Sequence, residues 1–299
     1  MKVGVIGAGY WGKKHVDEYT QMGSEVVVSD LVEGNLKACA EKFGSQTTKN
    51  HMDILNDKTI ESVSICTPNS THYALCAEAI KAGKHVMLEK PMTLDYKSAM
   101  GLVRMAEKAG SVLAVGHLYR FNNAVLKLKD MVAAGDFGDV RMVKTVWTNM
   151  EPVFPDRDIL FDLAIHPFDI VNFIFGRSPE NTFCLARGFR QGHEEAAFIS
   201  GALGRAMINF ELSWVTPDKV RDLVLVGADR TAFVKLVAQK MVVRDNETGK
   251  DADIGIAESN TIRKELENFL VCVDKGGQPV SSGRVGAEIV RVIEGIKRM

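Results

Sequence analysis

The glycine-rich turn near the N-terminus restricts the possible folds of this chain more than any other feature. An apolar strand pattern runs directly into Gly7, Gly9 and Gly12, which fit G-x-G-x-x-G, and a helical pattern follows. In this motif the first glycine permits a tight turn, the second lets the backbone approach a pyrophosphate, and the third allows close helix packing. The N–H groups of the following helix would then face the phosphates, and Tyr10 and Trp11 lie within the same turn. The motif predicts a dinucleotide site that includes these five residues.

By itself this motif also occurs in sheets that bind nothing, but the residues after it supply the expected context. A helical pattern leads to a second apolar run that ends in Asp30, 18 positions beyond Gly12 and 23 beyond Gly7. This is close to the spacing at which a carboxylate bonds both hydroxyls of an adenine ribose. The alternative is that Asp30 caps the next helix. The two residues after Asp30 are apolar, so a 2′-phosphate would meet negative charge without a compensating cation, which favours NAD over NADP.

Length and composition indicate a globular protein of two domains. At 299 residues the chain exceeds the usual size of one domain. We expect a dinucleotide-binding domain at residues 1–117 and a substrate-binding and oligomerisation domain at 118–299. A net charge of −1 leaves no basic field for nucleic acid. The apolar runs are too short to span a bilayer and the N-terminus enters a strand without a signal peptide, so we expect no membrane partner and a cytoplasmic location.

The cysteines and histidines give no sign of a disulfide framework or a metal site. The five cysteines are odd in number, scattered and without a C-x-x-C pair. They read as small buried hydrophobes in a reducing compartment. The seven histidines are equally dispersed and show no ligand spacing such as H-E-x-x-H, so we predict no metal site.

Strand and helix patterns alternate from residue 1 to about 117. Strands are expected near residues 2–6, 25–30, 62–67, 84–89 and 111–116, and helices near 12–22, 33–43, 70–82 and 93–109. Such alternation predicts an α/β domain of the Rossmann type, in which helices cover both faces of a doubly wound parallel sheet. Ligands of open parallel sheets lie beyond the carboxyl ends of the strands. Three loops therefore matter most: residues 7–12, 67–72 and 89–92.

Two of these loops carry candidate chemistry. Thr67, Pro68 and Asn69 end a strand, and the proline both stops the strand ladder and fixes a backbone angle. A plain turn would explain the same residue types, but their place at the carboxyl end of the strand favours contact with the cofactor. Glu89 and Lys90 follow the next apolar strand. Lys90 could be an ordinary solvated lysine, yet beside a nicotinamide it would titrate closer to the working range of a general acid or base.

Beyond residue 117 the sequence changes character. Adjoining strand patterns separated by turn signals predict a second α/β domain with a large, mostly antiparallel sheet. The strand patterns lie near residues 140–147, 182–186, 197–203, 206–214, 220–226, 232–237 and 241–244, and the helical patterns near 123–134, 259–275 and 284–297. We expect one face of this sheet to be covered and the other to be left for subunit contact or solvent.

A helical pattern near residues 158–175 contains the remaining candidates. Asp162, His166 and Asp169 follow one another at spacings of four and three, which places them on neighbouring ridges of one helix face. Pro167 marks an irregularity beside the histidine, either an interruption of the helix or its first turn. A lone helical histidine is more often structural than catalytic, but a nearby carboxylate can fix the tautomer of an imidazole and favour its charged form.

In this order the motifs resemble the Gfo/Idh/MocA oxidoreductase family over essentially the whole chain. The resemblance depends on the glycine turn, on Cys66-Thr-Pro-Asn69 with His72, on the segment from Gly83 to Pro91 that ends in Glu-Lys-Pro, and on Asp162-x-x-x-His166. It implies a Rossmann domain joined to an α/β domain whose sheet is commonly the oligomer interface, so we expect a homodimer or homotetramer. It also places His72 and Glu89 with the cofactor-binding residues.

Within the family, residues 115–122 and 161–166 are similar to segments of nucleotide-sugar dehydrogenases that oxidise UDP-N-acetylglucosamine at C3. The chain departs from the family pattern at Asn123, where a proline is usual, and at residues 152–158, which replace a glycine-rich approach to the catalytic helix. The resemblance therefore implies NAD-dependent oxidation of a sugar or nucleotide sugar. It leaves open which sugar, which hydroxyl and which physiological direction.

The resemblance further implies that Lys90 and His166 act in proton transfer, with Asp162 beside the substrate. We expect a secondary alcohol of the substrate to meet both groups near the nicotinamide, with His166 as proton acceptor and Lys90 as electrostatic partner, an assignment that the sequence does not separate from its reverse. Arg120 would bind an anion of the substrate or pair structurally. Two alternatives remain: a family dehydrogenase of a free pyranose or inositol, and a non-catalytic NAD-binding regulatory protein, which would not need the three catalytic candidates together.

Overall fold

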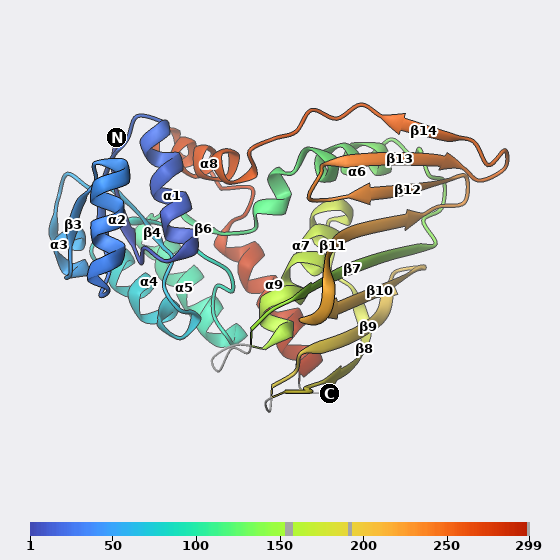
Figure 1. The fold of residues 1–299 in the computed structure, drawn as a ribbon, viewed down its shortest axis with the longest axis horizontal. Helices are drawn as coiled ribbons and strands as arrows, with labels where there is room; N and C mark the ends of the chain where they lie inside the picture. Colours follow the sequence, from blue (N-terminus) through green and yellow to red (C-terminus); the bar gives the residue numbers. More distant parts are fainter. Residues whose placement is uncertain (153–157, 191–192, 298–299) are drawn as a thin grey trace. The chain divides into compact units, whose positions relative to one another are not determined.

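A computed structural model describes residues 1–152, 158–190 and 193–297 (Figure 1). The chain divides into two compact units. Unit 1 comprises Met1–Leu118 and Thr261–Val290, and unit 2 comprises Tyr119–Asn260 and Arg291–Met299. The first segment of unit 1 ends beside the boundary predicted after residue 117. The chain then returns to unit 1 near its C-terminus, so part of the segment 118–299 packs with the first sheet.

Unit 1 is built on a parallel sheet, whose strands in the described residues follow the order β3-β2-β1-β4-β5-β6. They are β1 (Lys2–Ile6), β2 (Glu25–Ser29), β3 (Gln46–Thr48), β4 (Ser62–Ile65), β5 (His85–Leu88) and β6 (Leu113–Val115). Val5, Val28 and Val63 are fully buried, as expected where helices cover both faces of a parallel sheet. The strand order reverses between β1 and β4, and ligands of such sheets bind beyond the carboxyl ends at that point. The predicted Rossmann topology is confirmed.

Helices cover this sheet, and one of them comes from the far end of the sequence. The helices of unit 1 are α1 (Tyr10–Gln21), α2 (Glu33–Phe43), α3 (His51–Asn56), α4 (His72–Lys81), α5 (Tyr96–Ala109) and α8 (Thr261–Lys275), and α9 (Gly283–Lys297) begins in it. Leu266 and Phe269 of α8 join the core that includes Tyr19 of α1. Arg263 Nε donates to Glu18 Oε2 at 2.9 Å in the same contact. Because each large apolar side chain stabilises the fold by roughly 1.5–3 kcal/mol on burial, apolar packing dominates the attachment of α8.

Unit 2 is built on a sheet whose described strands follow the order β14-β13-β12-β11-β7-β10-β9-β8. They are β7 (Met142–Met150), β8 (Glu180–Arg187), β9 (Ala196–Leu203), β10 (Ala206–Ser213), β11 (Val215–Val226), β12 (Arg230–Lys235), β13 (Lys240–Asp245) and β14 (Asp251–Ile254). Neighbouring strands are antiparallel except for β7 and β10, which run parallel. The predicted large, mostly antiparallel sheet is confirmed.

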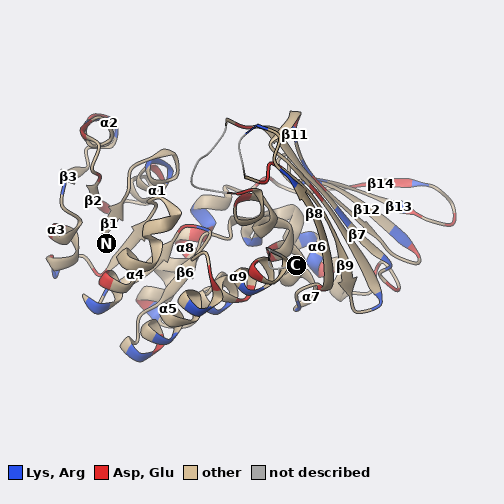
Figure 2. Cartoon of the chain, turned by 90° about the horizontal axis from the view of Figure 1, so that it is seen from below, with Lys and Arg blue, Asp and Glu red and all other residues tan. Residues whose placement is uncertain are grey.

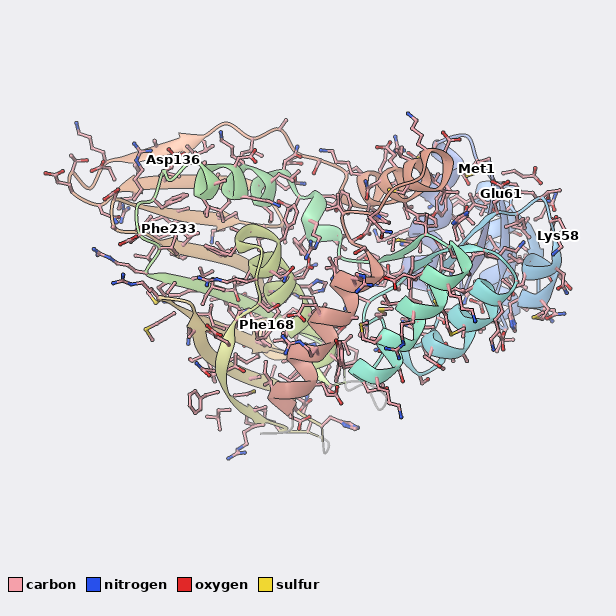
Figure 3. All side chains as sticks on the ribbon, turned by 180° about the vertical axis from the view of Figure 1, so that it is seen from behind. Met1, Lys58, Glu61, Asp136, Phe168 and Phe233 are labelled. Carbon is pink, nitrogen blue, oxygen red and sulfur yellow. The ribbon has the colours of Figure 1, made fainter. Side chains whose placement is uncertain are left out.

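Helices cover one face of this sheet, and Figure 3 shows them from that side. They include the 3-10 turn η2 (Leu118–Phe121), α6 (Asn123–Ala133), the π-helical turn η3 (Leu160–Ala164) and α7 (Ile165–Phe175). Phe168 of α7, labelled in Figure 3, meets Phe210 of β10 edge to face with ring centroids 5.0 Å apart. Such aromatic pairs contribute about 1 kcal/mol beyond their buried area, so this contact helps to hold α7 on the sheet.

The opposite face of the sheet carries exposed apolar side chains. Phe183 and Leu185 of β8 are 77% and 58% exposed, Phe198 of β9 is 53% exposed, and Met207 of β10 is 63% exposed. The strand register places them on one face, since Leu185 pairs with Phe198 and Met207 lies opposite Ala202. An apolar patch of this kind is typical of an interaction surface.

Charged residues show no segregation of sign over the described ribbon. Lys and Arg residues alternate with Asp and Glu residues along both units (Figure 2). The sequence as a whole carries a net charge of −1. Among the described helices, none has the length and apolar character needed to cross a membrane.

Three short elements are absent from the sequence-based prediction. β3 has three polar residues, α3 has six residues, and β14 forms the outer edge of its sheet. Each is too short or too polar to produce a clear apolar period, which is the signal that predicts secondary structure. β11 also begins earlier than predicted, at Val215, because a bulge separates its first residues from the regular ladder that starts at Val220.

Candidate active site

The predicted cofactor residues lie in the loops at the carboxyl ends of four strands of unit 1. Gly7, Gly9, Tyr10, Trp11 and Gly12 follow β1, and Asp30 follows β2. Thr67, Pro68, Asn69 and His72 follow β4, and Glu89 and Lys90 follow β5. β1 and β4 are the neighbours between which the strand order reverses. The sheet therefore brings these loops to the edge at which ligands of such folds bind.

The glycine turn has the geometry that its motif requires. Gly7 adopts a φ of +90°, which favours glycine, and a Cβ there would lie 2.7 Å from Cys66 O. A Cβ on Gly12 would lie 1.9 Å from Gly7 O, whereas nothing stands within 4 Å of a Cβ on Gly9. Close packing thus requires the first and third glycines, and the second leaves its backbone open to a ligand.

The start of helix α1 and the carboxylate of Asp30 lie against this turn. No side chain caps α1, whose N-cap is Gly9, so its first N–H groups are available to an anion. Asp30 Oδ2 accepts from Ala8 N at 2.6 Å, and Oδ1 accepts from Val32 N at 2.7 Å. The N-cap of α2 is Val32 without a side-chain hydrogen bond, so Asp30 does not cap that helix. The turn, the helix start and the carboxylate fit the pyrophosphate and adenine ribose of NAD.

Two aromatic side chains occupy the first turn of α1. The rings of Tyr10 and Trp11 meet edge to face with centroids 5.4 Å apart. Tyr10 is 72% exposed and Leu31, next to Asp30, is 88% exposed. These surfaces are open to a bound cofactor, and contact of Tyr10 and Trp11 with it stays a prediction.

His72 ties the loop after β4 to the loop after β5. The first loop continues into the 3-10 turn η1 (Asn69–Thr71). His72 is fully buried, and its ring nitrogens lie 2.7 Å from Pro91 O and 2.9 Å from Thr67 O. Burial lowers the pKa of His72, against the opposing effect of these backbone contacts. His72 thus joins the two loops, and its contact with the cofactor stays a prediction.

The carboxylate of Glu89 holds the backbone of Lys90. Glu89 is 8% exposed, its Oε2 accepts from Lys90 N at 3.1 Å, and His15 Nε2 lies 3.3 Å from its Oε1. Burial by itself would raise the pKa of Glu89, but the interactions with His15 and Lys90 lower it overall. Glu89 is therefore a carboxylate at neutral pH. Glu89 supports Lys90, whose own side chain is partly exposed, and its contact with the cofactor stays a prediction.

Cys66 completes a buried group with His15 and Glu89. Cys66 Sγ lies 3.6 Å from His15 Nδ1, and one metal-capable atom from each residue lies within 4.8 Å of the others. Burial raises the pKa of Cys66 and the charge of Glu89 adds to the effect, so the thiol keeps its proton and can donate it to His15 Nδ1. Both imidazole nitrogens thus have protein partners. The sequence does not reveal this group, because its members come from one helix and the ends of two strands.

In unit 2, Asp162 and His166 lie at a change of helical geometry. Asp158 Oδ1 accepts from two backbone N–H groups at 3.0 Å and so caps the start of the segment. Residues 160–164 form the π-helical turn and α7 begins at Ile165, so the predicted irregularity beside His166 is confirmed. Such π-turns are frequent at functional sites. Asp162 and His166 are partly exposed while the three residues between them are buried, which leaves both side chains accessible to a ligand.

Aromatic rings surround the imidazole of His166. It stacks on the indole of Trp147, with centroids 5.2 Å apart and planes at 16°. Tyr119 meets the imidazole and the indole edge on, at 5.4 and 5.0 Å, and Arg221 lies over the indole, 5.2 Å from its centroid. Burial raises the pKa of Tyr119 to about 12, against the opposing charge of Arg221. No sequence spacing links these residues, since they come from β7, η2 and β11.

Arg120 is a structural residue in this geometry. Its Nε donates to Asp169 Oδ1 at 2.7 Å and its Nη2 donates to Asn172 Oδ1 at 2.8 Å. Arg120 is 5% exposed, Asp169 is 1% exposed, and the guanidinium lies 5.0 Å from the ring centroid of Phe173. Of the two roles predicted for Arg120, these contacts favour structural pairing over contact with the substrate. Asp169 likewise does not share the exposed position of His166.

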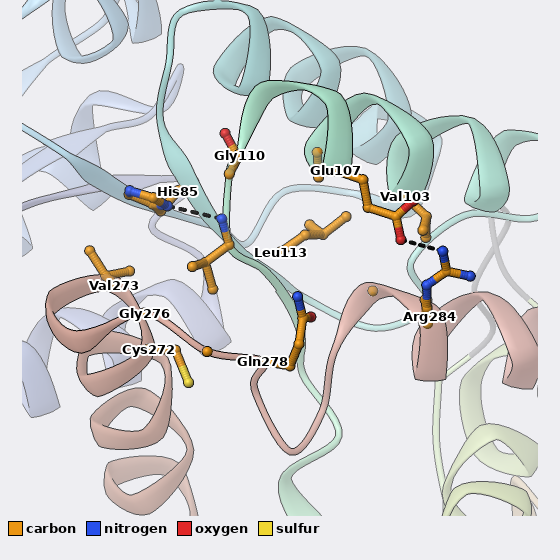
Figure 4. A pocket seen from close by; sticks show the side chains of 15 residues that line it. His85, Val103, Glu107, Gly110, Leu113, Cys272, Val273, Gly276, Gln278 and Arg284 are labelled. Carbon is orange, nitrogen blue, oxygen red and sulfur yellow. Dashed lines mark hydrogen bonds and ion pairs between the residues drawn. The ribbon is translucent and has the colours of Figure 1, made fainter.

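A cavity of about 480 Å³ lies elsewhere in unit 1 (Figure 4). His85 and Leu113, which begin β5 and β6, line it together with Cys272 of α8 and Arg284 of α9. It is therefore at the amino ends of the strands, opposite the edge that carries the glycine turn. The cavity is not the cofactor site that the loops define.

Comparison with known proteins identifies the family of the chain. The NAD-binding Rossmann-fold model of the Gfo/Idh/MocA oxidoreductase family matches residues 1–117, and the model of the family's C-terminal domain matches residues 125–232. The chain belongs to the Gfo/Idh/MocA family and is an oxidoreductase with an NAD-binding Rossmann domain. The resemblance predicted from the motifs is confirmed.

Individual relatives cover nearly the whole chain. UDP-N-acetylglucosamine 3-dehydrogenase of Acidithiobacillus ferrooxidans is 27% identical over 282 residues, which are 90% of this chain and 88% of the relative. Myo-inositol 2-dehydrogenase of Thermotoga maritima is 26% identical over 318 residues, 96% and 92% of the two chains. The solved structure of the A. ferrooxidans enzyme has a TM-score of 0.90 at 25% identity and covers 100% of this chain and 97% of that one. The departure of this sequence at residues 153–157 lies outside the described residues.

Proposed function

We propose that the protein oxidises a secondary alcohol of a sugar with NAD, and that its substrate is a nucleotide sugar such as UDP-N-acetylglucosamine at C3. The observation that carries the proposal is the partly exposed Lys90 beside a buried carboxylate at the NAD-binding edge of unit 1. The similarity to the A. ferrooxidans enzyme over 90% of the chain supports the choice of substrate.

In this reaction NAD, when bound, supplies the acceptor for the hydride that leaves the carbinol carbon. His166 takes the proton of the hydroxyl group, so that the alcohol becomes a ketone, a proton and a hydride. The cationic amine of Lys90 stabilises negative charge on the substrate oxygen as the proton departs. Asp162 orients the imidazole or the substrate, and Glu89 holds the backbone of Lys90. The reverse assignment, with Lys90 as the proton acceptor, uses the same residues.

We propose further that the protein acts as a homodimer or homotetramer in the cytoplasm. The exposed apolar side chains of β8, β9 and β10 support contact between copies of the sheet, since patches of that kind mark interfaces. All five cysteines are free thiols, which fits a reducing compartment. Sedimentation of the wild type and of a Phe183→Ser, Met207→Ser double variant tests the interface: dissociation is expected, and an unchanged mass would contradict it.

A substrate panel tests the proposed alcohol. We expect purified protein with NAD to raise absorbance at 340 nm with UDP-N-acetylglucosamine and to give a keto product two hydrogens lighter by mass spectrometry. Free N-acetylglucosamine, glucose and myo-inositol are the matched comparisons. Turnover of myo-inositol alone would favour the alternative that the T. maritima relative supports. No absorbance change with any compound would favour the non-catalytic NAD-binding alternative.

Substitution of Lys90 tests the mechanism. Lys90→Ala should lower turnover by at least about a thousandfold, since general acid–base and electrostatic contributions of this size are usual, while binding of NAD remains measurable by fluorescence. Lys97→Ala, at an exposed position of α5, is the control and should behave as the wild type. Near-normal turnover of the Lys90→Ala protein would remove Lys90 from the mechanism.

A further inference from the structure

The stack on His166 is built into the centre of the unit 2 sheet. Trp147 lies in β7, directly opposite Arg221 of β11 on one side and Leu212 of β10 on the other. Trp147 is 1% exposed. Because strands flank Trp147 on both sides, the orientation of its indole ring is fixed. The imidazole of His166 stacks parallel to this ring and is therefore held in the same orientation.

Arg221 is fixed against the same strand. Its Nη1 donates to Thr148 O at 2.6 Å and its Nη2 donates to Asn149 Oδ1 at 2.5 Å. The guanidinium therefore reaches the indole while its donors bond to β7 itself. Burial lowers the pKa of Arg221, and the nearby acidic groups Asp162 and Glu151 oppose that effect. Arg221 thus helps to hold the indole in place and lies close to the carboxylate that accompanies His166.

We propose that Trp147 is a positioning residue, which holds the imidazole of His166 in one plane and stabilises its protonated form. The proposal deepens the proposed function, in which His166 accepts a proton. A cation stacked on an indole is attracted by the electron density of the ring face. The ring of Tyr119 further restricts the rotation of the His166 imidazole. The imidazole is therefore held for proton transfer before a substrate arrives.

Among the described residues, three charged groups and one neutral phenol act around this stack. Arg221 from β11 places a cation on the indole and weakens its attraction for a second cation. Asp162 from η3 and Glu151 beyond β7 supply negative charge that acts on Arg221. Tyr119 from η2 remains a neutral phenol at working pH, because burial raises its pKa to about 12. The indole and the carboxylates thus favour the imidazolium, while Arg221 opposes it.

A matched pair of substitutions separates positioning from simple packing. Trp147→Leu removes the stacked ring, and Phe210→Leu removes another buried aromatic ring of the same sheet, one that packs on Phe168 of the same helix. Both leave cavities of a similar kind, so both should lower the midpoint of urea unfolding. Phe210 makes its ring contact with Phe168 and not with the imidazole, so a purely structural role of Trp147 predicts the same outcome for both variants.

Two measurements read out the role of Trp147. In NMR titrations of the ring nitrogens without NAD or substrate, with His166→Gln used for assignment, the titration midpoint of His166 should fall by about half a unit in Trp147→Leu. It should not move in Phe210→Leu. In kinetics at saturating NAD, Trp147→Leu should lower kcat by roughly 10- to 100-fold, as expected of misplaced catalytic groups. Trp147→Phe, which retains a ring face, should recover most of this loss, with Kd for NAD unchanged throughout.

The results also separate this inference from the proposed function. A midpoint that stays at the wild-type value in Trp147→Leu, or a kcat no lower than that of Phe210→Leu, would overturn the positioning role. If Trp147→Leu does not fold, Trp147→Met, which also lacks a ring face, takes its place: a midpoint below that of the wild type supports the role, and an unchanged one overturns it. Full turnover by His166→Gln would instead remove His166 from the proposed mechanism, and no turnover of any sugar by the wild type would refute the proposed function, whereas the NMR titration of the stack would retain its meaning.

Discussion

The two candidate proton-transfer groups of this protein have supports of opposite character. Lys90 stands next to a buried polar chain, in which Cys66, His15 and Glu89 contact one another and Glu89 holds the lysine backbone. His166 stands on a buried aromatic stack. The polar chain depends on the charge and the presence of every member, because a buried group without its partner is costly. The aromatic rings of the stack carry no net charge, and they act on the orientation and the protonation of the imidazole, so the two supports should fail in different ways.

The largest effect is expected from Glu89→Ala. The substitution leaves His15 and the backbone N–H of Lys90 without their buried partner, and each buried polar group left unsatisfied costs about 1–3 kcal/mol. Urea unfolding should show this loss, together with a severe loss of turnover. Glu41→Ala, on the exposed side of α2, is the control. A loss below about 1 kcal/mol would show that the chain contributes as little as a surface ion pair.

Arg120→Lys should cost about 2 kcal/mol, because the lysine keeps the charge but cannot bond to both Asp169 and Asn172 as the guanidinium does. If Arg120 is structural, as its contacts with Asp169 and Asn172 indicate, kcat/KM per folded molecule should stay near the wild-type value at temperatures well below the Tm. A rise in KM for the nucleotide sugar, with stability unchanged, would return Arg120 to the substrate site.

A smaller effect concerns the pH dependence of the polar chain. The folded-state pKa of Glu89 lies below its ordinary value of 4.5, so the native state binds the proton less readily than the unfolded chain. The associated stability is fully present above pH 4.5 and is lost as the pH falls through the lower folded-state value. Glu89→Gln should flatten the acid limb of the unfolding free energy, whereas Glu258→Gln, at an exposed position, should leave it unchanged. Parallel acid limbs for wild type and Glu89→Gln would exclude this contribution.

The smallest effect is expected from Tyr119→Phe. The ring that meets His166 and Trp147 edge on is retained, and no hydrogen bond to the phenol oxygen occurs among the described residues, so stability should change by less than about 1 kcal/mol. With a pKa of about 12 the phenol does not titrate near neutral pH, and the pH profile of kcat between 6 and about 10 should keep its shape. A tenfold fall in kcat would show that the hydroxyl contacts the substrate.

Much of the fold and part of the site followed from local patterns. The alternation of strands and helices predicted the parallel sheet, and G-x-G-x-x-G with Asp30 predicted the NAD-binding edge. Pro167 in the sequence predicted the irregularity of the helix beside His166. Weak or short patterns failed, as in β3, α3 and β14, because an edge strand or a single helical turn buries too little apolar surface to leave a clear period.

Those patterns could not predict which side chains of different helices and strands contact one another. Arg120 meets Asp169 across 49 positions, and His15 meets Cys66 across 51. The stack on His166 joins residues of η2, β7 and β11. From residue type alone, Arg120 could bind an anion of the substrate or form a structural pair. Its burial and its contacts favour the structural pair. The sequence patterns also did not reveal that His72 joins two loops or that Glu89 accepts from the backbone of Lys90.

The sequence by itself determined the sheet types, the glycine turn and the family, because these depend on periodicity and on residues close together in the chain. The tertiary structure alone decided which polar groups are buried and what each one contacts. Burial and pairing arise only when segments that are distant in the sequence come together in the folded state. Because a buried polar group without a partner is costly, the fold pairs such groups with one another.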